Sequence, residues 1–194
     1  MNSRLHRGST TLVVMDVQER LVAAMPDGTR GATIDNIIRL VQGCRVLGIP
    51  VVITEQYPTG LGRTVEPLSQ ALNEFAVQPP LVSKVDFDAC ADPAFIEALA
   101  GVSESSAGQG HSVVLCGMET HICVYQTARA LVERDIAVHV PMDASCCRRE
   151  CCHQAAAGLL RNAGALLSCT ETVLFECLGR AGTQEFKEIS KLVR

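Results

Sequence analysis

Apolar stretches, often rich in β-branched residues, recur along the chain. The first is TTLVVMD at residues 10–16, in which polar and apolar positions do not alternate. A strand without alternation is typical of a sheet that is covered on both faces. Further strands are predicted at 49–54, 81–87, 111–117 and 136–141, and a sixth at 164–169.

Segments with helical periodicity lie between these strands. Within 30–47, isoleucines and valines recur at helical spacing, and Gly48 is placed to end the helix. Other helices are predicted near 120–134, 148–162, 171–177 and 183–192. Strands that alternate with helices imply right-handed βαβ crossovers. We therefore predict an α/β fold of three layers (α/β/α), with a Rossmann-like, mostly parallel sheet of about six strands and helices on both faces.

The chain of 194 residues suits a single core, so we expect residues 1–194 to form one domain. Residues 1–9 precede the first strand and are expected to be flexible. The stretch at 101–110 is rich in Gly and Ser, which predicts a surface loop.

Charge and composition then narrow the function classes. The net charge of −4 argues against a nucleic-acid partner, because such surfaces usually carry a basic excess. No apolar run approaches the ~18 residues that span a membrane, so no membrane partner is expected. The start, MNSRLHRGST, has no apolar segment typical of secretory signals, which favours a cytoplasmic location. Its Arg and Ser content keeps a mitochondrial location as the alternative.

Ten cysteines in a chain of this size, without an export signal, indicate reduced thiols. Most are expected to be small buried residues. The densest group is CCRRECCH at 146–153, for which packing near a helix start is the first interpretation. Metal binding ranks lower because the chain has no C-x-x-C pair, and redox sensing through neighbouring thiols is a further alternative. We predict neither a metal nor another cofactor.

The ends of the predicted strands carry the candidate chemistry, because parallel sheets bind ligands beyond their carboxyl ends. Asp16 ends the first strand and Lys84 interrupts the third. Each has an ordinary alternative: an Asp that caps a turn, and a partly buried Lys in a salt bridge. Together they supply a carboxylate and an ammonium to one sheet.

Cys123 is the third candidate. If Thr120 caps the helix near 120–134, Cys123 occupies its third position, where the helix dipole favours a thiolate. A small residue packed under the helix is the alternative. Cys116 lies inside an apolar strand and is expected to be core.

Four segments together resemble the isochorismatase-like cysteine hydrolase family, closest to its small members of unassigned substrate. They are TTLVVMDVQERL, TEQYPTGLGRT, LVSKVDFDAC and GMETHICVYQTARALVERD, and the resemblance extends from about residue 10 to 178. It implies a catalytic triad of Asp16, Lys84 and Cys123. It also implies a cis peptide between Met118 and Glu119, which would let the backbone amides of Glu119 and Cys123 form an oxyanion hole.

The implied reaction is hydrolysis of an amide-type C–N bond in a small molecule through a thioacyl-enzyme, with Asp16 as base. The region after the second strand has no histidine, unlike the metal site of the family's nicotinamidases, so that activity and a catalytic metal are not expected. True isochorismatases of this fold lack the nucleophilic cysteine, which argues against their reaction as well. Candidate substrate contacts are the following residues, each of which also suits ordinary loop packing: Gln18, Gln56, Tyr57, Phe87 and Thr120.

The expected partner is a small-molecule substrate, and the resemblance also implies a homo-oligomer. A second function class stays open: a catalytically quiet oligomeric binding or scaffold protein that keeps the hydrolase fold.

Overall fold

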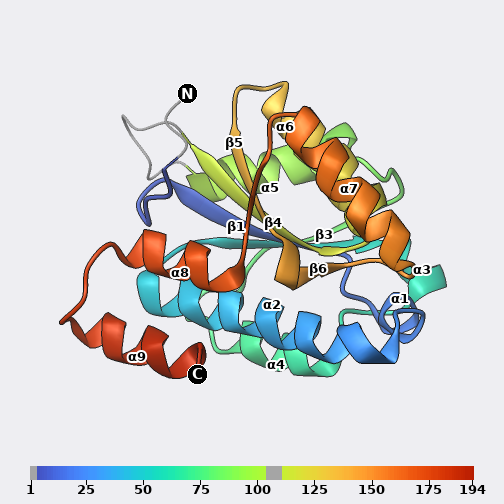
Figure 1. Ribbon diagram of the computed structural model, residues 1–194. Coiled ribbons are helices and arrows are strands. Elements are labelled where there is room, and N and C mark those ends of the chain that lie inside the picture. Colours follow the sequence, from blue (N-terminus) through green and yellow to red (C-terminus); the bar gives the residue numbers. More distant parts are fainter. Residues whose placement is uncertain (1–3, 104–110) are drawn as a thin grey trace.

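The computed structural model describes residues 4–103 and 111–194, and its centre is a sheet of seven strands (Figure 1). Six strands follow the order β3-β2-β1-β4-β5-β7, and β6 pairs with β4 beyond the end of β5. These seven strands pair with one another in parallel. The strands are β1 (Thr10–Met15), β2 (Val51–Gln56), β3 (Leu81–Lys84), β4 (Ser112–Met118), β5 (Ala137–Pro141), β6 (Ser145–Cys146) and β7 (Leu166–Ser168).

Helices cover both faces of this sheet, which confirms the predicted three-layer fold (Figure 1). The helices are α1 (Glu19–Ala23), α2 (Asp27–Leu47), α3 (Pro58–Leu61), α4 (Glu66–Asn73), α5 (Pro93–Ser103), α6 (Tyr125–Val132), α7 (Glu150–Asn162), α8 (Thr170–Leu178) and α9 (Gln184–Leu192). Helices α2, α4, α8 and α9 lie on one face, and α5, α6 and α7 lie on the other. Among the helices that the structure describes, none has the length and apolar character to cross a bilayer.

The two cores explain why the central strands show no polar alternation. Successive side chains of a strand point to opposite faces. Leu12 and Val14 of β1 therefore join the core under α2, whereas Val13 and Met15 join the core under α5, α6 and α7. Because both faces are covered, both sets are apolar and fully buried.

Several sequence predictions need correction. Strand β2 lies two residues later than the predicted 49–54, and β3 begins at Leu81 as predicted but ends at Lys84 instead of continuing to residue 87. The helices α1, α3, α4 and α5 and the strand β6 were not predicted. Within the stretch 1–9 that was expected to be flexible, Leu5 and Ser9 are buried and Arg7 and Gly8 are exposed, while 1–3 lie outside the described residues, so its flexibility stays a prediction. Of the loop predicted at 101–110, residues 101–103 belong to α5, and 104–110 also lie outside the description.

The cysteines behave as the sequence suggests. All ten are free thiols, and seven of them are buried. Burial raises the pKa of Cys90 and Cys177 to about 12, and that of Cys44 well above its usual value. These thiols are accordingly small apolar core residues.

The strand order reverses between β1 and β4, because the chain adds β2 and β3 on one side of β1 before crossing to β4 on the other. A crevice at the carboxyl ends of the strands is expected at such a point. Asp16 follows β1 there, and Glu119 follows β4. The fold thus brings two candidate site segments to one place.

Gly117 allows β1 and β4 to approach each other at this point. Its φ is +117°, and a Cβ at this position would overlap the backbone carbonyl oxygen of Met15, its partner in the parallel register. Only glycine combines this backbone conformation with such a close contact.

We expect Gly117→Ala to lower the free energy of unfolding by roughly 3 kcal/mol or more, since it adds both backbone strain and a clash with the Met15 backbone. Gly158→Ala is the matched control. Gly158 lies in α7 with open space around its Cα, so alanine there should stabilise by up to ~1 kcal/mol. Urea unfolding of both variants measures the difference, and equal stability of the two would contradict the role given to Gly117.

Candidate active site

Asp16 is a fully buried carboxylate at the end of β1. Its Oδ1 accepts a hydrogen bond from Thr54 Oγ1 at 2.6 Å, and its Oδ2 accepts one from Lys84 Nζ at 2.8 Å. Its φ of +53° lies in the left-handed region, which Asp tolerates better than most residues. Both carboxylate oxygens are therefore fixed by side chains of β2 and β3.

Lys84 is 2% exposed, so it is more deeply buried than the sequence suggested. Besides Asp16, its Nζ donates to Gln56 Oε1 at 2.6 Å and to the Asp86 carbonyl oxygen at 3.3 Å. Val82 and Lys84 point inward from β3, whereas Leu81 and Ser83 are exposed. This edge strand thus sends one ammonium into the interior, where oxygen atoms surround it.

Gln56 is held in place by Gln18, which is fully buried. The Gln18 side chain accepts from the Gln56 backbone N–H at 2.7 Å and donates to the carbonyl oxygens of Gln56 and Gly62. The Gln56 side chain in turn donates to the Val85 carbonyl oxygen at 2.6 Å. These bonds connect the segments after β1, β2 and β3 around Lys84. Sequence reasoning named Gln18 and Gln56 only as substrate contacts, and it missed Thr54.

Cys123 lies in a π-helical turn, Thr120–Val124, which precedes α6. Glu119 is the N-cap of this turn, so Thr120 is not the cap and Cys123 is the fourth residue, not the third. The thiol is buried and close enough to interact with both Asp16 and Lys84. The structure therefore brings together the three side chains that the sequence singled out.

The ionisation of Cys123 differs from the sequence prediction. Burial raises the pKa of its thiol to about 12, the negative charge of Asp16 adds to this effect, and Lys84 opposes it. The helix terminus was expected to favour a thiolate, but desolvation is the larger effect. At neutral pH the resting group is a thiol, with a carboxylate beside it that can accept its proton.

The Met118–Glu119 peptide bond is cis. The Glu119 carboxylate is 4% exposed and is bound by Arg148, whose Nε donates to Oε1 at 3.0 Å and whose backbone N–H donates to Oε2 at 2.8 Å. This contact ties the segment before Cys123 to the cysteine-rich segment after β6.

The remaining predicted residues lie at different depths. Tyr57 and Phe87 are 56% and 53% exposed, beyond the ends of β2 and β3. Thr120 is fully buried, with its Oγ1 3.0 Å from His153 Nδ1. Their role in substrate binding stays a prediction.

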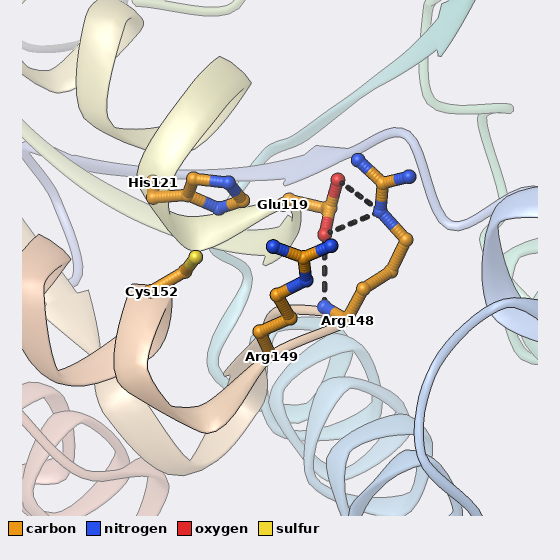
Figure 2. A pocket seen from close by; sticks show the side chains of 5 residues that line it. All are labelled: Glu119, His121, Arg148, Arg149 and Cys152. Atoms are coloured by element: carbon orange, nitrogen blue, oxygen red, sulfur yellow. Dashed lines mark hydrogen bonds and ion pairs between the residues drawn. The ribbon is translucent and has the colours of Figure 1, made fainter.

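A cavity of about 360 Å³ opens beside Glu119. Figure 2 shows the residues that line it: Glu119, His121, Arg148, Arg149 and Cys152. The His121 ring, from the π-helical turn, and the Cys152 sulfur, from α7, lie on the same side of the cavity. Thus part of the predicted packing cluster at 146–153 faces a solvent-accessible space.

Comparison with known proteins adds independent evidence. The Isochorismatase domain model matches residues 10–172. Isochorismatase domain-containing protein 2 from Bos taurus is 36% identical over 192 residues, covering 98% of this chain and 86% of that protein.

Two solved structures share the fold. A protein from Caenorhabditis elegans named MAR1 ribonuclease superposes with a TM-score of 0.86 at 33% identity, covering 98% of this chain and 92% of that one. The YcaC gene product from Escherichia coli, described as an octameric hydrolase of unknown specificity, gives 0.85 at 20% identity, covering 97% and 90%. On the family match and the sequence identity over nearly its whole length, this chain belongs to the isochorismatase-domain family.

Proposed function

We propose that this protein is a hydrolase that cleaves an amide-type C–N bond of a small molecule through a thioacyl-enzyme. Membership of the isochorismatase-domain family supports hydrolysis in general. The observation that carries the finer proposal is the meeting of Cys123, Asp16 and Lys84, all buried, where the strand order reverses. A nucleophile, a base and a fixed cation in contact are the parts that covalent acyl transfer requires.

In the first half-reaction, Asp16 takes the proton of the Cys123 thiol as the sulfur attacks the acyl carbon. The C–N bond then breaks, the nitrogen takes the proton from Asp16, and an amine leaves. The acyl group remains on Cys123 as a thioester. The raised pKa of Cys123 makes the base necessary, because little thiolate exists at neutral pH without it.

In the second half-reaction, Asp16 takes a proton from water, and the oxygen attacks the thioester carbon. The C–S bond breaks, the acid leaves, and the proton returns to the sulfur. In both steps negative charge develops on the acyl oxygen. We assign the backbone amides of Glu119 and Cys123 to the stabilisation of this charge as an oxyanion hole.

Lys84 acts in this scheme as a positioning and charge-compensating residue. Its bond to Asp16 fixes the carboxylate, and its positive charge stabilises the thiolate when that forms. Gln56 accepts a hydrogen bond from Lys84, and Gln18 in turn holds Gln56 in place. We therefore assign both glutamines to the positioning of Lys84 before any contact with substrate. Tyr57 and Phe87, exposed beyond the same strand ends, suit contacts with the substrate at the entrance.

We propose that the chain acts as a homo-oligomer, for which the octameric state named for the YcaC relative is supporting analogy only.

The Caenorhabditis elegans relative is named a ribonuclease, which makes RNA the competing substrate class. The net charge of −4 favours a small molecule over RNA. The proposed reaction requires no metal. As the compartment we propose the cytoplasm, with the mitochondrion as the alternative.

Incubation with a panel of small amides and acyl-transfer probes, followed by mass spectrometry of the intact protein, tests the nucleophile. We expect acyl adducts on Cys123 in the wild type and none in Cys123→Ala. Cys151→Ser, which removes an exposed thiol, should behave like the wild type. Failure to form any adduct would instead support a catalytically quiet binding or scaffold protein. Cleavage of an RNA oligonucleotide that survives Cys123→Ala would also overturn the proposal.

The electrostatics can be tested by titrating the ultraviolet absorbance of the Cys123 thiolate, taken as the difference from the matching Cys123→Ala protein. In the wild type we expect no thiolate from this residue up to pH 9, since its pKa is raised to about 12. Asp16→Asn should lower that pKa by roughly 1 to 3 units, because it removes a neighbouring negative charge. A Cys123 thiolate already present at pH 8 in the wild type would contradict this account.

A further inference from the structure

Three potential metal ligands meet beside the candidate active site, and the proposed hydrolysis uses none of their side chains. A carboxylate oxygen of Glu119, a ring nitrogen of His121 and the Cys147 sulfur all lie within 4.8 Å of one another. We propose that they form a binding site for a thiophilic divalent cation of the Zn²⁺ class. The inference is independent of the proposed hydrolysis, which assigns only a backbone amide to Glu119.

The strand β6 creates this cluster. Its two residues pair in register with β4, with Cys146 opposite Met118, so that the next residues, Cys147 and Glu119, come side by side. His121 follows two residues later in the π-helical turn. The ligands therefore come from two segments that are 26 or more residues apart in the chain but held by one sheet.

The donor atoms of these three side chains indicate which metal the site would prefer. Thiolate, imidazole and carboxylate together are typical of Zn²⁺, and three protein ligands leave a fourth position open. His121 Nδ1 already lies 3.1 Å from Cys147 Sγ. Bonds of ~2.3 Å to sulfur and ~2.1 Å to nitrogen place tetrahedral ligands about 3.5 Å apart, so the His121 and Cys147 side chains require little movement. On binding, the Cys147 thiol would release its proton to solvent.

Two of the three ligands can be reached from solvent, whereas Cys147 is buried. Glu119 and His121 line the cavity of about 360 Å³, and the Cys152 sulfur faces the same space (Figure 2). Cys152 is thus a protein candidate for the fourth position, which water can otherwise fill. The sequence alone ranked metal binding low because the cysteines show no C-x-x-C spacing, but the missing ligands lie on a different segment.

Arg148 competes with a cation for the Glu119 carboxylate. Its Nε donates to both oxygens of Glu119, at 3.0 and 3.1 Å, while its side chain is 56% exposed. An exposed side chain can withdraw into water at little cost, so the contact weakens metal binding without preventing it. Removing Arg148 should therefore strengthen binding, which a nonspecific thiol site would not show.

Titration of the fully reduced protein with Co²⁺, a spectroscopic probe for Zn²⁺ sites, tests the proposal. We expect about one equivalent to bind, with a thiolate-to-cobalt charge-transfer band that Zn²⁺ abolishes. His121→Asn and Cys147→Ser should each weaken binding at least 10-fold, and Arg148→Ala should tighten it. Cys151→Ser, which removes an exposed neighbouring thiol, should bind as the wild type does.

Circular dichroism and thermal unfolding verify that each variant is folded before its affinity is compared. The proposal is overturned if the wild type shows no charge-transfer band. It is equally overturned if folded His121→Asn and Cys147→Ser bind as tightly as the wild type, or if Cys151→Ser loses the metal.

Discussion

The buried ion pair between Lys84 and Asp16 is the constraint on which the site depends. Two opposite charges without measurable side-chain exposure lie 2.8 Å apart in the interior of the protein. Their removal from water costs several kcal/mol for each ion, and mutual attraction recovers this only with further hydrogen bonds. Those bonds come from Thr54 and Gln56, so the pair explains why polar residues lie near the end of β2.

The same pair sets the chemistry of the cysteine. Cys123 lies beside the Asp16 carboxylate, which opposes its ionisation, and the Lys84 ammonium, which favours it. Burial is the largest effect, and it raises the pKa of the thiol. A thiol that is neutral at rest reacts with electrophiles less readily than a thiolate does. The parallel sheet makes this arrangement possible, because it brings the ends of β1 and β4 together, and Gly117 allows them to approach.

Much of the fold could be predicted from the sequence because its central strands are buried on both faces and lack alternation. The strand β6 could not, since two residues carry no periodicity and this strand forms only by pairing with β4. The helix α4 was missed although Leu68, Ala71 and Leu72 already lie at helical spacing.

At the site, Asp16 and Lys84 could be predicted because they are charges in apolar strands. The raised pKa of Cys123 and the proximity of Cys147 to Glu119 depend on burial and tertiary pairing, which no local pattern encodes.

If the pair is kept for catalysis, stability and function should separate when it is replaced. The most direct measurement is a double-mutant cycle with Asp16→Asn, Lys84→Met and the double variant, in which unfolding free energy and Cys123 acylation are measured together. We expect Lys84→Met to lower the free energy of unfolding by roughly 3 to 5 kcal/mol, because a buried carboxylate is left without its ion-pair partner. The double variant should regain most of this stability but form no acyl adduct. A double variant that is as reactive as the wild type, or no more stable than Lys84→Met, would show that the ion pair does not have this role.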